Sequence, residues 1–170
     1  MESPEQYTPG PASEARVRKN GDRWTLILVR DLRHPPAIVW EALTDCEQLR
    51  EWAPFDVTGD LKSERSTVSL TWTGTGNTSV VRVTRVHAPH TLEFGDIRWE
   101  LEPIGAGTRL ILWHNIDRRY ISWGAAGWHI CFDVLERMLE GNPMSRIVGA
   151  DAMKLEGWKR LTAEYAKQFE

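Results

Sequence analysis

The segment that most constrains the fold covers residues 119–143, "RYISWGAAGWHICFDVLERMLEGNP", which has the length of one helix and ends in helix-stopping Gly and Pro residues. On a wheel with 3.6 residues per turn, its apolar side chains fill an arc of roughly 200°. The arc comprises Trp128, Ile130, Cys131, Phe132, Val134, Leu135, Met138 and Leu139, and Cys131, Leu135 and Met138 lie near its centre. The remaining edge is polar and carries His129, Asp133, Glu136, Arg137 and Glu140. Because a surface helix needs an apolar stripe of only about 100°, this helix is predicted to lie in a trough that contacts it on three sides.

A curved antiparallel sheet would supply such a trough. Residues 66–72, 79–86, 91–94, 97–103 and 108–116 read as strands joined by short turns. Apolar and polar residues alternate along most of these strands, which predicts an antiparallel meander with one apolar face and one charged face. A helix of about 17 residues is roughly 25 Å long, and a strand of seven residues spans about 23 Å. The predicted helix and strands therefore match in length.

One strand and two short helices are predicted before this meander. Residues 24–32, "WTLILVRDL", read as a strand because large apolar and β-branched residues dominate them. Prolines suit the first turn of the helix in "HPPAIVWEALTD". Thr44–Glu47 has the form of a capping box, so a second helix is expected to begin there and to end near Trp52. A last helical stretch covers about residues 149–169, and Gly157 marks a break in it.

The length of 170 residues is sufficient for one domain with a sizeable core. Residues 1–21 hold three prolines among polar residues, which predicts a disordered N-terminal arm. Residues 22–170 are then a single domain. Four basic residues at the end of the arm are interpreted as a solvated cluster: Arg16, Arg18, Lys19 and Arg23.

The composition argues against two classes of partner. With 41% hydrophobic residues, 26% charged residues and a formal net charge of −3, the chain lacks the basic excess of a nucleic-acid-binding protein. No apolar run approaches the ~20 residues of a membrane span, and the N-terminus has no apolar signal segment. Cys46 and Cys131 lack CxxC spacing, which is typical of reduced thiols in a reducing cytosol. A cytoplasmic location is expected.

Several motifs resemble those of a known family. "VWEALTDCEQLREWAP" (39–54), "GTRLILWH" (107–114), "GWHICFDVLERMLEG" (127–141) and the tail "GWKRLTAEYAKQF" are similar to segments of the branch of the START/Bet v 1-like (SRPBCC) superfamily related to the activator of Hsp90 ATPase homologue 1. The resemblance covers about residues 24–169. It implies an α+β helix-grip fold, in which a curved antiparallel β-sheet wraps around a long C-terminal helix and two short helices follow the first strand. The segment "DVTGDLKSERSTV" departs from the family, whose members often have a Gly-Gly strand opening there.

Nine tryptophans indicate either a very aromatic core or a lined cavity. The apolar face of the sheet and the long helix are expected to face one another, and Ile97 and Leu110 belong to this apolar face. A solid core is one reading of this arrangement, and a cavity that holds a small hydrophobic or aromatic ligand is the other. The predicted ligand-binding residues are Val68, Leu70, Trp72, Trp99, Leu101, Leu112, His114, Trp128, Cys131, Phe132 and Leu135.

His114 is the candidate polar group of this site, because strand alternation places it on the inward face. It is interpreted either as a buried neutral imidazole or as a group that anchors a ligand oxygen or exchanges protons, with Asp117 and Tyr120 nearby to assist. His87 and His90 bracket a turn, and two histidines without a third ligand make a poor metal site. No metal or other cofactor is expected.

Three functions remain open at this stage. The first is non-enzymatic binding of a small hydrophobic ligand in the cavity, and the second is an enzyme of the cyclase, dehydratase or hydrolase type that uses the same cavity. The third is activation of a chaperone ATPase such as Hsp90, which the resemblance suggests but the single helix-grip domain does not favour. Trp113 and Ile111 point to the outer face of the sheet, where either the last helix or a second subunit would cover them. A homodimer contact is predicted there.

Overall fold

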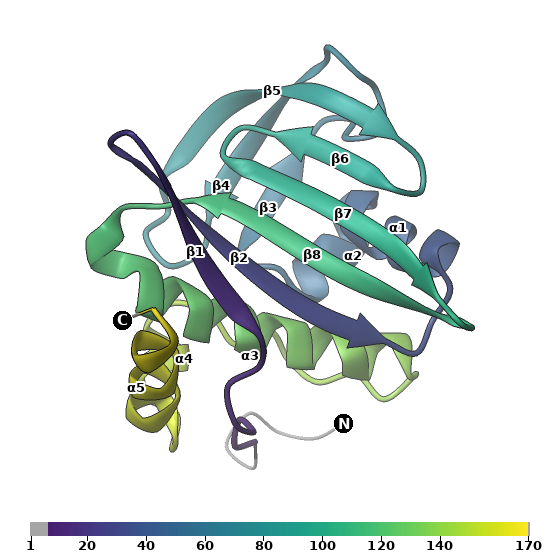
Figure 1. Cartoon of the computed structure of the whole chain (residues 1–170). Helices are drawn as coiled ribbons and strands as arrows, with labels where there is room; N and C mark the ends of the chain where they lie inside the picture. The colour runs from purple at the N-terminus through teal and green to yellow at the C-terminus, as the bar shows by residue number, and fades with distance from the viewer. Residues whose placement is uncertain (1–6, 170) are drawn as a thin grey trace.

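The computed structural model describes residues 7–169 and consists of one antiparallel sheet with helices against its concave side (Figure 1). The eight strands are β1 (Ala15–Asn20), β2 (Arg23–Leu32), β3 (Phe55–Thr58), β4 (Thr67–Trp72), β5 (Thr78–His87), β6 (Thr91–Phe94), β7 (Ile97–Ile104) and β8 (Gly107–Asn115). The helices are α1 (Pro36–Thr44), α2 (Cys46–Trp52), α3 (Ile121–Leu139), α4 (Ala150–Met153) and α5 (Trp158–Gln168), and a 3₁₀ turn (Arg118–Tyr120) precedes α3. The strand order is β1-β2-β8-β7-β6-β5-β4-β3. This confirms the predicted α+β helix-grip fold.

The long helix α3 lies across the curled sheet, as the wide apolar arc predicted (Figure 1). Cys131 and Leu135, at the centre of the arc, are at most 1% exposed, and Met138 is half-buried against the core. Leu26 and Leu28 of β2 and Leu112 of β8 are completely buried on the inner face of the sheet. The helix therefore owes its stability mainly to burial of its apolar circumference rather than to helix propensity. No helix of the described part of the chain is long and apolar enough to cross a membrane.

The predicted disordered arm over residues 1–21 is wrong for residues 15–20. They form β1, which pairs antiparallel with β2, so that Ala15 lies opposite Leu28 and Asn20 opposite Arg23. The basic residues of this stretch conceal the strand, because only Ala15 and Val17 mark its inner face. Backbone hydrogen bonds to β2 stabilise a strand that its own composition does not predict. Residues 1–6 of the predicted arm lie outside the described residues.

The second short helix begins one residue later than the capping box indicated. Asp45, not Thr44, is the N-cap of α2, and its carboxylate accepts a hydrogen bond from the backbone N–H of Glu47. The Thr44 hydroxyl instead donates to the backbone carbonyl of Trp40 at 2.8 Å. The two helices therefore meet at a single residue, because Asp45 ends α1 and caps α2.

The segment after α2, which departs from the family pattern in sequence, contains the short strand β3. Phe55 and Val57 are at most 1% exposed and alternate with polar residues over only four positions, too few to give a clear strand signal. β3 pairs with β4 and closes the far edge of the sheet. Farther along, Leu61 is completely buried and fixes the loop between the two strands.

The polar edge of α3 is covered rather than solvated. Arg30 of β2 donates from Nη1 to Asp133 Oδ1 at 2.8 Å and to Glu136 Oε1 at 3.0 Å. The hydroxyl of Tyr7 donates to the other Asp133 oxygen. Burial and the Asp133 carboxylate together raise the pKa of Tyr7. The segment before β1 thus lies over the helix and completes its enclosure.

The C-terminal helix α5 covers the same edge of α3 (Figure 1). His129 is 3% exposed, and its Nδ1 lies 2.7 Å from the hydroxyl of Tyr165. The same hydroxyl accepts a hydrogen bond from the backbone N–H of Ser13 at 3.1 Å. Gly157, with φ of 91°, precedes the helix, which confirms the break that this glycine predicted. Helix α5 therefore joins the start and the end of the described chain over the middle of α3.

Arg30 allows a direct test of this partly buried charge cluster. Replacing Arg30 by Met leaves Asp133 and Glu136 without their cation, and we expect the free energy of unfolding to fall by about 2 kcal/mol. The matched control is Arg109→Met. Arg109 of β8 forms an ion pair with Asp31 of β2, the neighbour of Arg30, and both side chains of this pair are exposed. An exposed pair contributes about 0–1 kcal/mol. Urea unfolding followed by tryptophan fluorescence measures both values, and equal losses would contradict the assigned role of Arg30.

Candidate functional site

An aromatic cluster fills the centre of the space between the sheet and α3. The ring centroids of Trp99 and Trp128 are 5.5 Å apart, and those of Trp128 and Phe132 are 6.0 Å apart. Trp52 of α2 lies 6.1 Å from Trp99, and its indole nitrogen donates to the backbone carbonyl of Ala42 at 3.0 Å. Edge-to-face and tilted contacts at these distances are favourable beyond simple burial. In the centre of the space between the sheet and α3, the tryptophans thus form an aromatic core.

Most of the predicted ligand-binding residues belong to this core or border it. Eight of them are 0–3% exposed and line neither of the two clefts described below: Val68, Leu70, Trp99, Leu101, Leu112, Trp128, Phe132 and Leu135. Trp99 differs from its neighbours because its indole N–H is buried and has no acceptor among the described residues. A buried donor without a partner costs free energy. Trp72, His114 and Cys131 are the three predicted residues that reach a cleft.

The first cleft, here called the histidine cleft, has a volume of about 480 Å³. It lies at the end of the sheet where β4, β7 and β8 meet the segment after α3. Its lining residues are Pro54, Trp72, Thr73, Gly74, Thr75, Asn77, Asp96, His114, Ile116 and Gly149. Trp72 and His114 stack in parallel, with ring centroids 5.6 Å apart and an interplanar angle of 5°. The two rings offer a flat wall to the cleft.

His114 is fixed in one neutral form by its inner neighbour. The indole N–H of Trp128 donates to His114 Nδ1 at 3.1 Å. Since an indole nitrogen is only a donor, Nδ1 must be unprotonated and the proton of the neutral ring lies on Nε2. Burial lowers the pKa of His114 to about 4, so the ring is neutral near pH 7. None of the described residues accepts a hydrogen bond from Nε2.

The expected helpers of His114 have other partners. The Asp117 carboxylate accepts hydrogen bonds from the backbone N–H of Arg119 at 2.9 Å and from its guanidinium, which together lower the pKa of Asp117 to about 2. Tyr120 is 47% exposed and lies against Trp123. The prediction that Asp117 and Tyr120 assist His114 is therefore wrong for this structure. The 3₁₀ turn before α3 directs both of them to the surface.

The second cleft, here called the helix cleft, has a volume of about 200 Å³ and runs along the flank of α3. Its lining is almost entirely apolar: Pro54, Trp123, Gly127, Cys131, Ile147, Val148, Gly149, Ala152, Met153 and Trp158. Pro54 and Gly149 also line the histidine cleft, so the two clefts adjoin. At their boundary Gly74 and Gly149 approach so closely that a Cβ added at Gly149 would lie 2.8 Å from the Gly74 Cα.

Sequence reasoning missed the wall of the helix cleft that follows α3. Ile147 and Val148 lie in a segment to which the sequence assigned no element, and Ala152 lies near the start of the predicted last helix. The segment is mostly irregular, and its apolar residues show neither helical nor strand periodicity. The run "RIV" ahead of a glycine was the one local signal of burial.

Arg146 holds this segment against the sheet. Its Nη1 donates to Asp56 Oδ1 at 2.7 Å and to the backbone carbonyl of Ala53 at 3.3 Å. The segment after α3 is thereby tied to β3 and to the end of α2. This ion pair positions the residues that both clefts share.

Two further sequence interpretations concern the outer surface. Ile111 and Trp113 do point away from α3, but α5 packs on α3 and β1, and the guanidinium of Arg98 lies over the Trp113 ring at 5.6 Å. A homodimer contact there stays a prediction.

His87 and His90 form a ring pair 5.7 Å apart at the β5–β6 turn. Within residues 7–169 no group of three His, Cys, Asp or Glu side chains is arranged to hold a metal.

Comparison with known proteins agrees with the fold and the chain order. Residues 33–140 match the sequence profile of a family described as Activator of Hsp90 ATPase homolog 1-like protein. No curated protein matches the chain. The solution structure of CalU16 from Micromonospora echinospora is similar with a TM-score of 0.69 and 21% identity, over 96% of both chains.

Two more solved structures have the same architecture. The crystal structure of CalU16 gives a TM-score of 0.66 at 20% identity and covers 92% of this chain and 93% of its own. A conserved protein of unknown function from Enterococcus faecalis gives 0.67 at 15% identity, over 91% of this chain and 90% of its own. At these identities the likeness concerns the fold alone.

The pKa of His114 predicts how stability depends on pH. The folded value of about 4 lies below the ordinary value of 6.5, so the unfolded chain binds more protons between these two pH values. The free energy of unfolding is therefore expected to fall as the pH falls from 6.5 to 4, by on the order of 3 kcal/mol for this residue. His129, whose burial also lowers its pKa to about 4, adds a second contribution of the same sign.

The variant His114→Asn isolates the first contribution. Its amide oxygen replaces Nδ1 as the acceptor for Trp128, and its side chain does not titrate. Urea unfolding at pH 4.5, 5.5 and 6.5 is expected to give a weaker pH dependence in His114→Asn than in the unchanged protein. Identical pH dependence in the two proteins would show that folding does not lower the pKa of His114.

Proposed function

Because the chain belongs to the family of Activator of Hsp90 ATPase homolog 1-like proteins, we propose that it binds a small hydrophobic or aromatic ligand, without catalysis, between the sheet and α3. The binding site in this proposal is the pair of adjoining clefts at the open end of the sheet. The observation that carries the proposal is the stacked pair of Trp72 and His114 in the wall of the histidine cleft. A planar ligand can extend this stack.

His114 gives the site a polar preference. Its Nε2 carries the proton of the neutral ring, because Nδ1 accepts from Trp128, and it has no acceptor among the described residues. A ligand oxygen with a free lone pair would satisfy this donor. A carbonyl or ether oxygen suits a neutral N–H donor in a partly buried site, whereas a cation offers no acceptor. The preferred ligand is therefore an aromatic compound that carries a hydrogen-bond acceptor.

The helix cleft supplies the apolar part of the site. Cys131, Ile147 and Trp158 line it, and it adjoins the histidine cleft at Pro54 and Gly149. Burial of each 100 Å² of apolar ligand surface there contributes about 2.5 kcal/mol. Burial raises the pKa of the Cys131 thiol to about 12, so this cysteine acts as an apolar wall and not as a nucleophile.

The aromatic core would form the inner limit of the site. A ligand that reached past His114 would have to separate Trp99 from Trp128, whose rings are in contact. It would gain the indole N–H of Trp99 as a donor, which has no acceptor among the described residues. The core residues predicted from the sequence thus belong to the proposal only for ligands that open this contact.

Gly127 provides a test that does not disturb the fold. A Cβ at this position would meet no heavy atom within 4 Å, and the residue lines the helix cleft. Leu and Ala both favour helix over Gly by up to about 1 kcal/mol, so neither Gly127→Leu nor the control Gly127→Ala should destabilise α3. With the fluorescent aromatic ketone prodan as probe, Gly127→Leu is expected to weaken binding about tenfold or more by filling the cleft. Gly127→Ala is expected to retain binding.

The emission shift of prodan and the change in melting temperature measure binding in all three proteins. If neither prodan nor a panel of aromatic ketones binds the unchanged protein, the proposal fails. If prodan binds equally well to Gly127→Leu, the helix cleft is not its site.

The polar preference has its own comparison. His114→Asn removes the Nε2 donor and keeps the acceptor for Trp128, so it should weaken binding of an aromatic ketone more than binding of naphthalene, which has no acceptor. Calorimetric titration with 2-acetylnaphthalene and naphthalene gives, for each ligand, the ratio of its affinity for the unchanged protein to its affinity for His114→Asn. Equal ratios for the two ligands would exclude His114 as the ligand's hydrogen-bond donor.

A further inference from the structure

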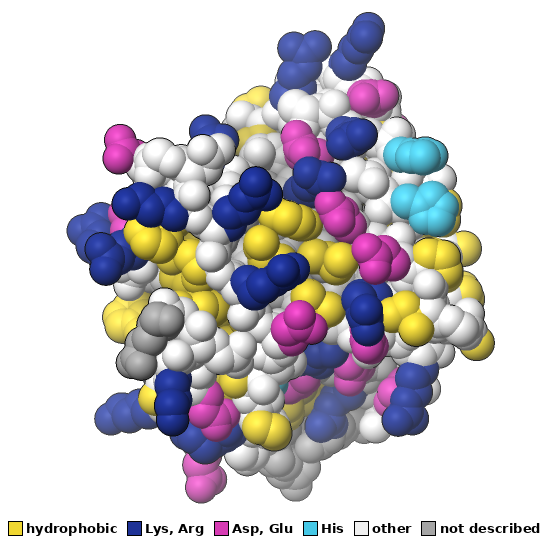
Figure 2. Space-filling view, in the orientation of Figure 1, with side chains coloured by type: hydrophobic (Ala, Val, Ile, Leu, Met, Phe, Trp, Pro, Cys, Tyr) yellow, Lys and Arg dark blue, Asp and Glu magenta, His cyan; other side chains and the backbone are white. Residues whose placement is uncertain are grey.

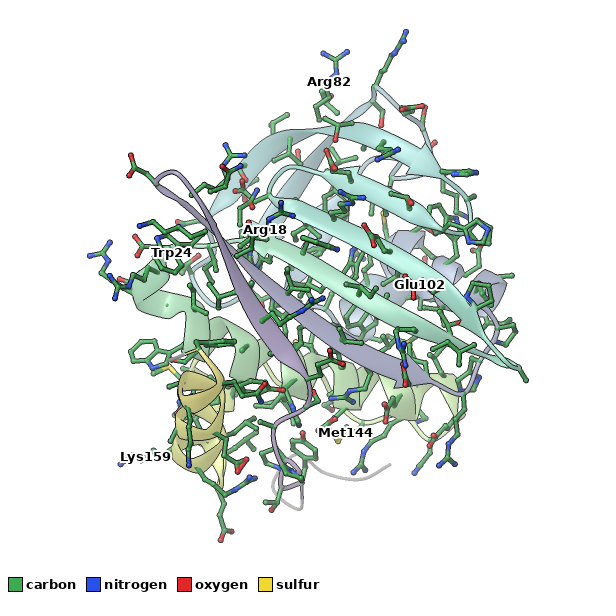
Figure 3. All side chains as sticks on the ribbon, viewed as in Figure 1. Arg18, Trp24, Arg82, Glu102, Met144 and Lys159 are labelled. Carbon is green, nitrogen blue, oxygen red and sulfur yellow. The ribbon has the colours of Figure 1, made fainter. Side chains whose placement is uncertain are left out.

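A third cleft lies on the outer face of the sheet, on the opposite side from α3. It has a volume of about 390 Å³ and is here called the outer cleft. The residues of its lining that carry charge are Arg18, Arg23, Glu93, Asp96 and Arg98. Figure 2 shows Lys and Arg side chains gathered on this face around a hydrophobic stretch, and Figure 3 labels Arg18 and Trp24 at the β1–β2 hairpin. The outer cleft shares Asp96 of the β6–β7 turn with the histidine cleft, and its other lining residues do not line that cleft.

The strand register explains why these residues meet. Arg18 of β1 lies opposite Thr25 of β2, and Thr25 lies opposite Asn115 of β8. One step along the sheet, Arg98 of β7 lies opposite Trp113 of β8. The basic cluster that the sequence assigned to a solvated arm is therefore placed by β1 beside an arginine more than 70 residues away in the chain.

The arginines on the hairpin side of the outer cleft have no ion-pair partner. None of the described residues forms a salt bridge with Arg18 or Arg23, and both side chains are exposed. The carboxylates lie on the other side of the cleft, where Glu93 accepts a hydrogen bond from the hydroxyl of Thr84 at 2.9 Å. The cleft is thus polarised, with its unneutralised cations towards β1 and β2.

Two nitrogen donors beneath the cleft have no acceptor either. Arg98 is held by Glu100 through Nη2 at 2.6 Å, and its guanidinium lies over the Trp113 ring. Its Nε and the indole nitrogen of Trp113 are buried without an acceptor among the described residues. Asn115 uses its amide oxygen to accept from Thr25 at 2.7 Å, which leaves its amide N–H₂ to donate. The outer cleft therefore has more hydrogen-bond donors than acceptors to satisfy them, and more positive than negative charge.

We propose that the outer cleft binds a small molecule through an oxyanion, carboxylate or phosphate, held by Arg18, Arg23 and Arg98. Guanidinium groups pair with both kinds of oxyanion through charge-assisted, often bidentate hydrogen bonds. A small shift of the Arg98 side chain would bring Arg98 Nε and Trp113 Nε1 within reach of the bound oxygens. The Trp113 ring gives the body of the molecule an apolar surface.

Nuclear magnetic resonance reports directly on the two unpartnered donors. The full chain labelled with nitrogen-15 is titrated with sodium phosphate and, separately, with sodium acetate, while sodium chloride keeps the ionic strength constant. The Trp113 Nε1–H and Arg98 Nε–H resonances, assigned with Trp113→Phe and Arg98→Lys, are expected to shift and saturate. The Trp52 indole N–H already donates to the carbonyl of Ala42, so its resonance is the internal reference and its chemical shift should not change. Saturation by one salt and not the other identifies the headgroup.

The double variant Arg18→Gln/Arg23→Gln is expected to bind the effective anion about tenfold more weakly, because two charge-assisted contacts are lost. The matched control is Arg82→Gln/Arg85→Gln, which removes the same charge from exposed arginines of β5 that do not line the outer cleft. Its affinity should stay within about twofold of the unchanged protein. The proposal is overturned if neither salt gives a saturable shift, or if both double variants weaken binding equally.

Discussion

The enclosure of α3 is the constraint on which the rest of the molecule depends. A helix whose apolar side chains occupy more than half of its circumference is stable in water only if other elements surround it. The curled sheet surrounds the apolar arc, and the segment before β1 together with α5 covers the polar edge. Because Asp133 and Glu136 of that edge are partly buried, Arg30 reaches across from β2 and neutralises them. The packing of one helix thus fixes the position of elements from both ends of the described chain.

The same packing determines where a ligand can bind. The indole rings of Trp52, Trp99 and Trp128 meet in the middle of the trough and leave the open end of the sheet as the accessible part. His114 stands at the boundary between these two regions. Its inner nitrogen is bound to α3 through Trp128, and its ring face is stacked on Trp72 at the cleft. One side chain therefore links the packing of the core to the chemistry of the surface, and its neutrality follows from burial.

The sequence predicted the features that rest on long, regular patterns. The apolar arc of α3 and the alternation in β4, β7 and β8 predicted the fold and the inward direction of His114, because a periodic pattern averages over many residues. The strands β1 and β3 were missed because each has only two inward apolar residues. The apolar wall near Ile147 depends on contacts between segments far apart in the chain, such as the ion pair of Arg146 with Asp56, which no local pattern encodes. Of the residues that line the two clefts, the sequence therefore predicted Trp72, His114 and Cys131, and it missed those of the β4–β5 turn and of the segment after α3.

The close approach of Gly74 and Gly149 has a consequence for the size of the proposed site. Where Gly74 and Gly149 meet, only backbone separates the histidine cleft from the helix cleft, and Pro54 lines both clefts beside this contact. A slight parting of the β4–β5 turn from the segment after α3 would join the two volumes into one continuous channel. Because neither residue has a Cβ atom, the partition is thin, and one elongated ligand could then occupy both clefts at once.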